Sequence, residues 1–182
     1  MVKLYLVRHG QAAAGIGESI DPGLDNLGQR QAVNAAEQLG RLPAMPLFSS
    51  PLLRARQTAL PLAQRWQADV TIEARMAEIP FPSDDLEKRS RWLQSVMPGT
   101  WSALDEYWQS WRRSVIACLL EQRQDCVFFS HFIAINVTVG SASNDDRMVV
   151  FRPDNASITR LLIRDGALHV DALGGEAVTR VN

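Results

Sequence analysis

The sequence predicts an α/β fold, a three-layer sandwich in which a mainly parallel sheet with an antiparallel edge carries helices on both faces. Two observations support this prediction. In the first half of the chain, short apolar runs alternate with segments of helical periodicity, as in parallel strands connected by helices. Near the end, two strand-like runs flank Arg164-Asp165-Gly166, and Asp-Gly is a strong hairpin signal that supplies the antiparallel edge.

The composition is that of an ordinary globular protein. At 182 residues, with 46% hydrophobic and 21% charged residues, we expect one domain over residues 1–182. The net charge of −1 gives no electrostatic reason to expect nucleic acid or a membrane surface as a partner, and the composition leaves the oligomeric state open. The chain has no apolar run that could cross a bilayer and no signal-peptide pattern, so we expect a cytoplasmic protein. Cys118 and Cys126 fit buried thiols better than a disulfide or a zinc site.

The first half of the chain contains three expected strands and two expected helices. The strands are residues 3–7, 46–50 and 70–72. The first helix spans residues 27–42, with Asp25 or Asn26 as its N-cap and Leu27 on its apolar stripe. The second helix begins near Leu52, and Pro61 should kink or interrupt it because proline removes a backbone donor.

The second half is expected to begin with helices and to end in strands. Residues 84–124 are mostly helical in pattern, with a break at Pro98-Gly99. Residues 126–131 repeat the arrangement of the first strand, in which apolar residues are followed by a histidine. Further strands are expected at residues 147–151, 157–163 and 167–172.

Polar side chains follow three of these strands, at the point where each strand ends. They are Arg8 and His9 after the first strand, Ser49, Ser50, Arg54 and Arg56 around the end of the second, and Ser130 and His131 at the end of the fourth. Ligands of open α/β sheets bind beyond the carboxyl ends of the strands. We therefore expect two histidines and at least two guanidinium groups to share one pocket.

This combination of side chains suits a phosphate ligand. Guanidinium groups pair bidentately with phosphate oxygens, and a neutral imidazole can attack phosphorus to form a covalent intermediate. Gly10, directly after His9, lets the backbone come close to an anion. The negative charge of phosphate favours the protonated form of a nearby carboxyl, and Glu78, after the third strand, is the best-placed donor of a proton to the leaving oxygen.

Each of these residues also has a simpler interpretation. Arg54 and Arg56 could lay their stems along a helix face, Glu78 could be a surface glutamate, and His131 could be a hydrogen-bonded core histidine. No group of residues has the spacing of metal ligands, so no metal is expected. The functional interpretation depends on the coincidence of the parts.

Four segments resemble the motifs of the histidine phosphatase superfamily, which includes the cofactor-dependent phosphoglycerate mutases. The segments are Leu6-Val7-Arg8-His9-Gly10-Gln11-Ala12, Asp21-Pro22-Gly23-Leu24 with Gly28 and Gln31-Ala32, Ser49-Ser50-Pro51-Leu52-Leu53-Arg54-Ala55-Arg56-Gln57-Thr58-Ala59, and Asn155-Ala156-Ser157-Ile158-Thr159. They occur in the family's order. The resemblance implies a phosphoglycerate mutase-like fold and a place in the small phosphatase branch of the superfamily.

The resemblance also implies a role for each candidate residue. His9 would be the residue that becomes phosphorylated. Arg8 and Arg54 would bind the phosphoryl oxygens, and His131 would donate a hydrogen bond to the same group as charge builds up. Glu78 would be the proton donor, because its neighbours resemble the family's segment around the acid. No cofactor is expected, and the expected mechanism is independent of a metal.

Three departures from the family pattern distinguish this chain. Phe132 and Ile133 follow the second histidine, where the family usually has two glycines, and Phe132 could narrow or roof the pocket. Pro80-Phe81-Pro82 stands where the family continues "G-x-W-E-G" after the acid. Ala12-Ala13-Ala14-Gly15 replaces the asparagine-containing loop of the mutases, which favours hydrolysis over mutase chemistry.

Residues 80–115 are expected to form a helical lid over the active site. The segment holds four of the five tryptophans and a group of basic residues. These are Trp92, Trp101, Trp108 and Trp111, with Lys88, Arg89, Arg91, Arg112 and Arg113. Such a cover could admit a phosphorylated ligand with an apolar or ring-shaped leaving group. Trp108 and Trp111 also lie three residues apart, as in the core stripe of a helix.

The sequence therefore predicts a metal-independent phosphatase that acts through a phosphohistidine on His9. Its substrate would be a small phosphomonoester or a phosphorylated protein side chain. Two alternatives stay open, a phosphoglycerate mutase-like phosphotransferase and a module that binds phosphorylated ligands without turnover.

Overall fold

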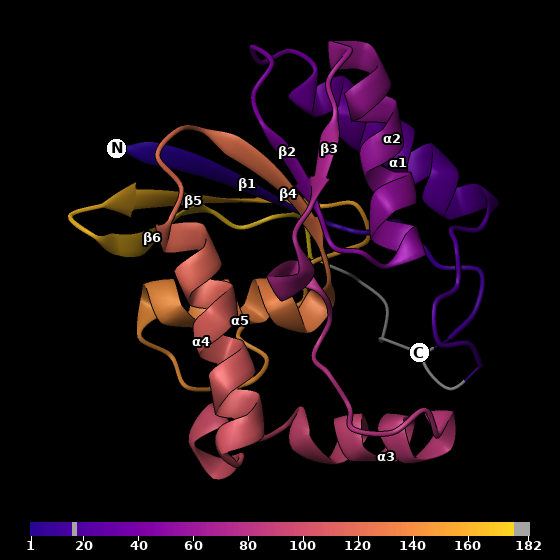
Figure 1. Ribbon diagram of the computed structural model, residues 1–182, viewed down its shortest axis with the longest axis vertical. Coiled ribbons are helices and arrows are strands. Elements are labelled where there is room, and N and C mark those ends of the chain that lie inside the picture. The colour runs from indigo at the N-terminus through magenta and orange to yellow at the C-terminus, as the bar shows by residue number, and fades with distance from the viewer. Residues whose placement is uncertain (16–17, 177–182) are drawn as a thin grey trace.

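The computed structural model describes residues 1–15 and 18–176, and six strands in this part of the chain form one sheet in the order β3-β2-β4-β1-β5-β6 (Figure 1). The strands are β1 (Val2–Arg8), β2 (Leu47–Ser49), β3 (Val70–Ile72), β4 (Cys126–Ser130), β5 (Ile158–Arg164) and β6 (Ala167–Ala172). The pairings among β1, β2, β3 and β4 are parallel, whereas β5 and β6 pair in antiparallel fashion. The predicted mainly parallel sheet with an antiparallel edge is confirmed.

Helices cover both faces of the sheet (Figure 1). One face is covered by α1 (Asn26–Leu39) and α2 (Leu53–Trp66), and the other by α4 (Glu106–Leu120) and α5 (Phe132–Ser143). A shorter helix, α3 (Leu86–Val96), lies away from the sheet, beyond one end of α4. Two 3₁₀ turns, η1 (Ala74–Met76) and η2 (Trp101–Ala103), complete the helical elements of the described residues. Among these residues, no helix is long and apolar enough to span a membrane.

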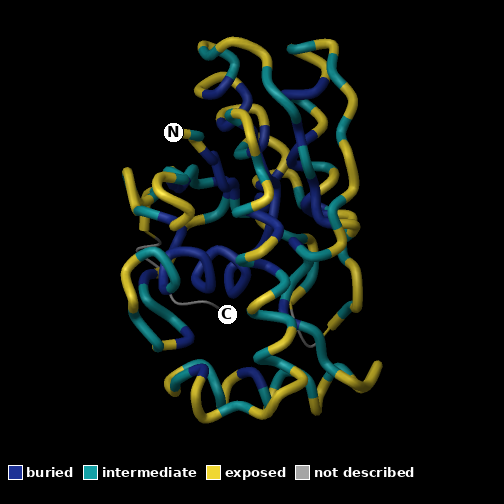
Figure 2. Tube along the Cα trace, turned by 60° about the vertical axis from the view of Figure 1, so that its left-hand side comes forward, coloured by how far each residue is buried: buried dark blue, intermediate teal, exposed yellow. Residues whose placement is uncertain are grey.

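The side chains of β1 alternate between two core clusters. Leu4 and Leu6 pack in the cluster that includes α4 and α5, and Tyr5 and Val7 pack in the cluster that includes α1 and α2. A strand covered on both faces is expected to divide its side chains in this way. Figure 2 shows the buried residues concentrated in the central strands and in one helix, which is α5, because residues 132–140 are all buried.

The two cysteines are buried free thiols, as expected. Cys118 lies in α4 and Cys126 at the start of β4. Burial raises the pKa of each thiol to about 12, so both remain protonated at neutral pH.

One expected strand is wrong. Residues 147–151 do not form a strand, apart from one isolated bridge at Arg147. The reason is Asn136 of α5, whose side-chain carbonyl accepts the N–H groups of Val150 at 2.8 Å and Phe151 at 3.1 Å. Because a helix side chain satisfies these backbone donors, the segment needs no neighbouring strand.

The first two helices follow their predicted signals with two corrections. Asp25 is the N-cap of α1 and accepts the N–H of Gly28 at 2.7 Å. Leu27 is 40% exposed, and Gly28 takes the buried position in its place. α2 continues through Pro61 to Trp66, because buried residues on both sides of the proline hold the helix against the sheet.

Gly10 and Gly28 meet where the loop after β1 approaches α1. A Cβ atom on Gly10 would lie 2.5 Å from the carbonyl oxygen of Gly28, and one on Gly28 would overlap the carbonyl oxygen of Gln11. The N–H of Gly10 also donates to Oγ1 of Thr58 at 3.0 Å. Two backbones in contact therefore fix the segment that follows His9.

We expect Gly28→Ala to reduce the free energy of unfolding by about 2–3 kcal/mol, because the added methyl group meets backbone that cannot move aside like a side chain. Urea unfolding measures the change. Gly175→Ala is the matched control, since a Cβ atom there would meet nothing within 4 Å. Equal stability of both variants would show that the loop at Gln11 relaxes to accept the methyl group.

Candidate active site

The carboxyl ends of β1, β4 and β2 lie side by side and bring the predicted residues together. The N–H of His9 donates to the carbonyl of Ser130 at 2.9 Å, just beyond the pairing of β1 with β4. The N–H of Ser50 donates to the carbonyl of Phe129 at 2.9 Å, on the other side of β4. His9, Ser50 and His131 therefore leave three adjacent strands at the same edge of the sheet.

His9 is buried, and its hydrogen bonds define where its proton lies. Nδ1 is 2.7 Å from the carbonyl oxygen of Gly10. A carbonyl oxygen can only accept a hydrogen bond, so Nδ1 carries the proton. Nε2 is 3.2 Å from Nε of Arg54, which can only donate, so Nε2 presents a lone pair. Burial, together with the charges of Arg54 and Arg8, lowers the pKa of His9 to about 3. At neutral pH the imidazole is uncharged and nucleophilic at Nε2.

Arg54 is fixed in the first turn of α2. Besides its contact with His9, its Nη1 lies 3.7 Å from a carboxylate oxygen of Asp21. Its backbone carbonyl accepts the hydroxyl of Thr58 at 2.7 Å, and the same hydroxyl oxygen accepts the N–H of Gly10. Thr58 thus links the arginine to the loop after His9. Its position four residues after Arg54, one helical turn, could have indicated this link.

Arg8 lies against Phe132. Nη1 of Arg8 donates to the carbonyl of Pro153 at 2.8 Å, and its guanidinium carbon is 5.2 Å from the centroid of the Phe132 ring. Phe132 is the first residue of α5 and is 6% exposed. The aromatic residue that replaces the family's glycine is therefore a packing partner of Arg8.

His131 is fully buried at the N-cap position of α5. Its ring centroid lies 5.1 Å from that of His9. Nε2 of His131 is 2.7 Å from Oγ of Ser50, whereas Nδ1 has no partner among the described residues. Burial is the main cause that lowers the pKa of His131 well below its usual value, and repulsion from the nearby arginines, and from His9 once it is protonated, adds to it. This ring is therefore also neutral at neutral pH.

Glu78 is held at the N-terminus of α5. Each of its carboxylate oxygens lies 3.2 Å from the N–H of Ile133, and Oε1 also accepts the N–H of Ile79 at 3.0 Å. Burial lowers the pKa of Arg8 and Arg54, and the negative charge of Glu78 opposes that shift in both. The carboxylate is therefore within electrostatic range of both guanidinium groups.

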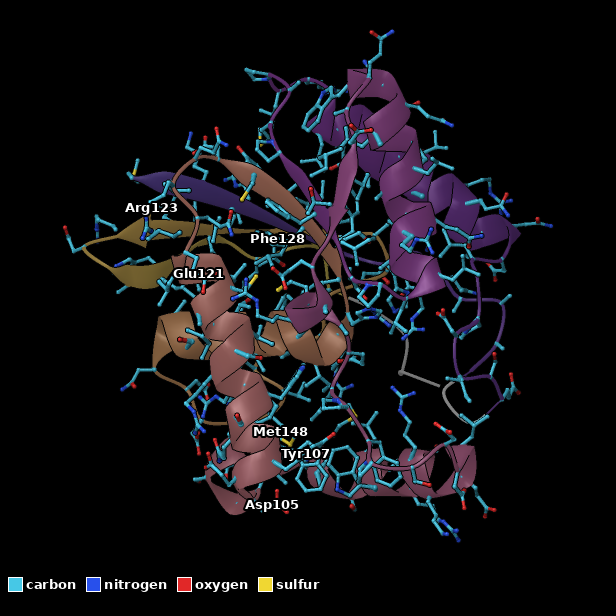
Figure 3. The ribbon with its side chains drawn as sticks, in the orientation of Figure 1. Asp105, Tyr107, Glu121, Arg123, Phe128 and Met148 are labelled. Atoms are coloured by element: carbon cyan, nitrogen blue, oxygen red, sulfur yellow. The ribbon has the colours of Figure 1, made fainter. Side chains whose placement is uncertain are left out.

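The segment before Glu78 is anchored on two sides. The hydroxyl of Ser130 donates to the carbonyl of Met76 in η1 at 2.7 Å, which ties the segment to β4. Arg75 of η1 pairs with Glu121 at 2.9 Å, and Figure 3 shows Glu121 at the end of α4 nearest the sheet. These contacts fix the approach to the acid.

An aromatic cluster continues from the segment after Glu78 into the predicted lid. Phe81 contacts Trp92 with ring centroids 5.4 Å apart, and Trp92 stacks on Trp108 at 4.7 Å. The indole N–H of Trp108 donates to the carbonyl of Pro80 at 3.0 Å. Tyr107, labelled in Figure 3 where α4 approaches α3, meets the edge of Trp108. Pro80-Phe81-Pro82, which departs from the family pattern, is thus the segment against which α3 and α4 pack.

All four tryptophans of the expected lid contact the core. Trp101 is fully buried within it, and Trp92, Trp108 and Trp111 are partly buried and pack against the same cluster. Arg56 is exposed on α2, away from the group around Arg54. Sequence reasoning named Arg89 of α3 only as one of five basic residues in the expected lid and gave it no role of its own. Its positive charge adds to the effect of burial in lowering the pKa of Arg54 and of His131.

Two surface hollows lie apart from these side chains. One surface hollow of about 390 Å³ lies between residues 97–99 and 147–152, and another of about 620 Å³ lies along α1. Neither is lined by His9, Arg54 or His131. Over residues 1–15 and 18–176, no three His, Cys, Asp or Glu side chains gather in a group that could hold a metal ion.

Comparison with known families identifies one family over nearly the whole chain. Residues 4–175 match the model of the histidine phosphatase superfamily (branch 1). The chain belongs to the histidine phosphatase superfamily. It is an enzyme of the histidine phosphatase type, and the predicted family and fold are both confirmed.

The relatives of this histidine phosphatase include a mutase and a phosphatase. The chain is 28% identical over 185 residues to a probable phosphoglycerate mutase, GpmB, of Erwinia tasmaniensis, covering 88% of this chain and 85% of that protein. It is 38% identical over 80 residues to a glucosyl-3-phosphoglycerate phosphatase of Mycobacterium tuberculosis. The second alignment covers 42% of this chain and spans only 36% of the length of that relative.

Solved structures show the same fold over nearly the whole chain. The native structure of mycobacterial glucosyl-3-phosphoglycerate phosphatase matches with a TM-score of 0.75 and 21% identity, covering 97% of this chain and all of that one. Phosphoserine phosphatase from Entamoeba histolytica, in complex with 3-phosphoglyceric acid, matches with a TM-score of 0.74 and 24% identity, covering 96% and 98%. At these identities the similarity establishes the fold alone.

The neutral state of His9 makes stability depend on pH. The imidazole of His9 takes up its second proton only near pH 3 in the folded chain, but near pH 6.5 in the unfolded chain. Between these pH values, unfolding therefore takes up a proton. We expect the free energy of unfolding to fall as pH decreases from 6.5 toward 3, with His9 contributing up to about 1.4 kcal/mol per pH unit. Urea unfolding at a series of pH values measures this slope, which should be smaller in His9→Gln. Identical slopes in the two proteins would contradict the assignment.

Proposed function

We propose that this enzyme hydrolyses phosphomonoesters without a metal ion, through a phosphohistidine on His9. The observation that carries the proposal is the pair of contacts made by the two ring nitrogens of His9. A proton fixed on Nδ1 by the Gly10 carbonyl leaves a lone pair on Nε2, which faces a guanidinium group. This arrangement suits attack on a phosphorus atom whose oxygens that guanidinium binds.

In the first step, Nε2 of His9 forms a bond to phosphorus, and the bond between phosphorus and the leaving oxygen breaks. Glu78, in its protonated form, gives its proton to the leaving oxygen, which departs as an alcohol. In the second step, water attacks the phosphohistidine, the P–N bond breaks, and the Glu78 carboxylate takes the proton from the water. Inorganic phosphate leaves, and His9 and Glu78 return to their starting states.

Two guanidinium groups and one imidazole would bind the phosphoryl oxygens. Arg54 exchanges its contact with His9 for a phosphoryl oxygen, and Arg8 contributes from the other side of the site. Nε of Arg8 and Nδ1 of His131 are both buried without a partner among the described residues, which leaves them free to contact a phosphate group. Residues 80–115 would act as the lid, with Arg89 adding positive charge.

A small phosphorylated metabolite is the substrate class that the relatives support best. One relative is named for glucosyl-3-phosphoglycerate and another for phosphoserine. Mutase chemistry is the second candidate, since a relative that aligns over most of this chain is a probable phosphoglycerate mutase. The loop at Ala12–Gly15 consists of small residues and lacks the asparagine expected in the corresponding loop of the mutases, which favours hydrolysis.

We expect the protein to hydrolyse p-nitrophenyl phosphate equally well with and without EDTA, and His9→Ala to lose activity by at least about a thousandfold, because the nucleophile is absent. Release of p-nitrophenol measures the rate, and acid-labile labelling by a radioactive phosphomonoester detects the phosphohistidine. His169→Ala on β6 is the control and should retain activity. Loss of activity in EDTA, or full activity in His9→Ala, would refute the proposal.

We expect Glu78→Gln to slow hydrolysis more for a poor leaving group than for a good one, because an alkoxide needs a proton that p-nitrophenolate does not. The loss of kcat should be about tenfold larger for phosphoserine than for p-nitrophenyl phosphate. Glu37→Gln, at an exposed position on α1, is the control for the substitution itself. Equal losses for the two substrates would show that Glu78 is not the proton donor.

A further inference from the structure

Ser50 contacts a catalytic candidate and has no role in the mechanism described so far. Its Oγ lies 2.7 Å from Nε2 of His131, and both residues are fully buried. The β2–β4 pairing holds Ser50 through its N–H bond to Phe129, and Pro51 restricts Ser50 to an extended backbone. The hydroxyl is therefore fixed in place beside the imidazole.

The hydrogen bonds around Ser50 show which way its proton can point. Oγ accepts the N–H of Leu52 at 3.2 Å, which occupies one of its lone pairs. The hydroxyl proton is still available, and Nε2 of His131 is the acceptor within reach. Donation in this direction would make Nε2 the unprotonated nitrogen of a ring that carries a single proton.

The other nitrogen of the same ring sets the functional requirement. Nδ1 of His131 is buried without a partner among the described residues, so it is the ring nitrogen left for a ligand. Phosphoryl oxygens accept hydrogen bonds, so Nδ1 must carry the proton if His131 is to contact them. A neutral imidazole carries one proton, so Nδ1 can be protonated only if Nε2 is not. A hydroxyl that donates to Nε2 stabilises this tautomer.

We propose that Ser50 is a positioning residue that donates its hydroxyl proton to Nε2 of His131 and thereby keeps the Nδ1 proton directed at the transferring phosphoryl group. The inference rests on the proposed phosphatase mechanism, and it adds a residue and a tautomer to it. Without this donor, His131 can shift its proton to Nε2 and present a lone pair to the phosphoryl oxygens, which repel it.

The first test reads the tautomer directly in the ligand-free protein. Nitrogen-15 NMR of the histidine side chains should show the Nδ1–H form for His131 in the wild type and a shift toward the Nε2–H form in Ser50→Ala. An Nε2–H form in the wild type would overturn the proposal. Because this measurement needs no turnover, it stands or fails independently of whether the enzyme hydrolyses phosphomonoesters.

The second test separates positioning from simple stability. Ser50→Ala should lower kcat for p-nitrophenyl phosphate by about tenfold to a hundredfold with little change in KM, and Ser50→Thr, which keeps the hydroxyl, should recover most of it. Thr138→Val is the matched control, since it removes a buried hydroxyl that bonds only to its own helix. It should retain kcat.

A double-mutant cycle then decides whether Ser50 acts through the histidine. In a His131→Ala background, Ser50→Ala should have almost no further effect on kcat, because the group that it orients is gone. The same loss in both backgrounds, or unchanged kcat in Ser50→Ala alone, would overturn the proposal. If the wild type shows no hydrolysis while the NMR result holds, the phosphatase mechanism fails and the tautomer assignment survives.

Discussion

The parallel pairing of β4 with β1 on one side and with β2 on the other is the constraint on which the site depends. It sets Val7 opposite Phe129 and continues through the N–H bonds of His9 and Ser50 to carbonyls of β4. Because side chains alternate along a strand, a shift of one residue would turn the polar strand ends toward the wrong face and expose the apolar residues that precede them. Burial of the two core clusters therefore fixes the register, and the register fixes the histidines. The chemistry at the edge of the sheet is stabilised by apolar packing within it.

The first turn of α5 carries much of the remaining organisation. His131, Phe132 and Ile133 are consecutive, yet each contacts a different part of the site: the imidazole meets Ser50, the aromatic ring meets Arg8, and the backbone N–H meets Glu78. Replacing the family's two glycines with larger residues keeps the backbone donor, since every residue except proline has an N–H. It also adds a surface against which a guanidinium group packs. The departure from the family pattern therefore leaves the anchoring of the acid intact and changes how one arginine is held.

Local patterns predicted the elements and the strand ends, but they could not predict contacts between distant side chains. The alternation in β1 and the Asp-Gly hairpin are properties of a few neighbouring residues, which is why the sheet could be predicted. Residues 147–151 have the composition of a strand, but Asn136 of another element takes up their backbone donors. In the same way, the contact of Glu78 with α5 spans 55 residues, and that of Ser50 with His131 spans 81. The sequence names these residues as candidates, but only the packed sheet shows which of them touch.

Burial, reinforced by charge, explains why the two histidines are neutral. Arg8, Arg54 and Arg89 all act on the same region, and the carboxylates that oppose them are Glu78, Asp21 and Asp154. An imidazolium among these cations would add unfavourable charge in a buried site, so burial and the arginines together hold both rings in the uncharged form. The same excess of positive charge favours a phosphate dianion. The arginines would therefore both attract an anionic group and, in addition to burial, keep the His9 lone pair available. A neutral ring is also one whose tautomer matters. In such a site, the Gly10 carbonyl, which accepts from Nδ1, fixes the tautomer of His9, and the proposed donation from Ser50 would fix that of His131.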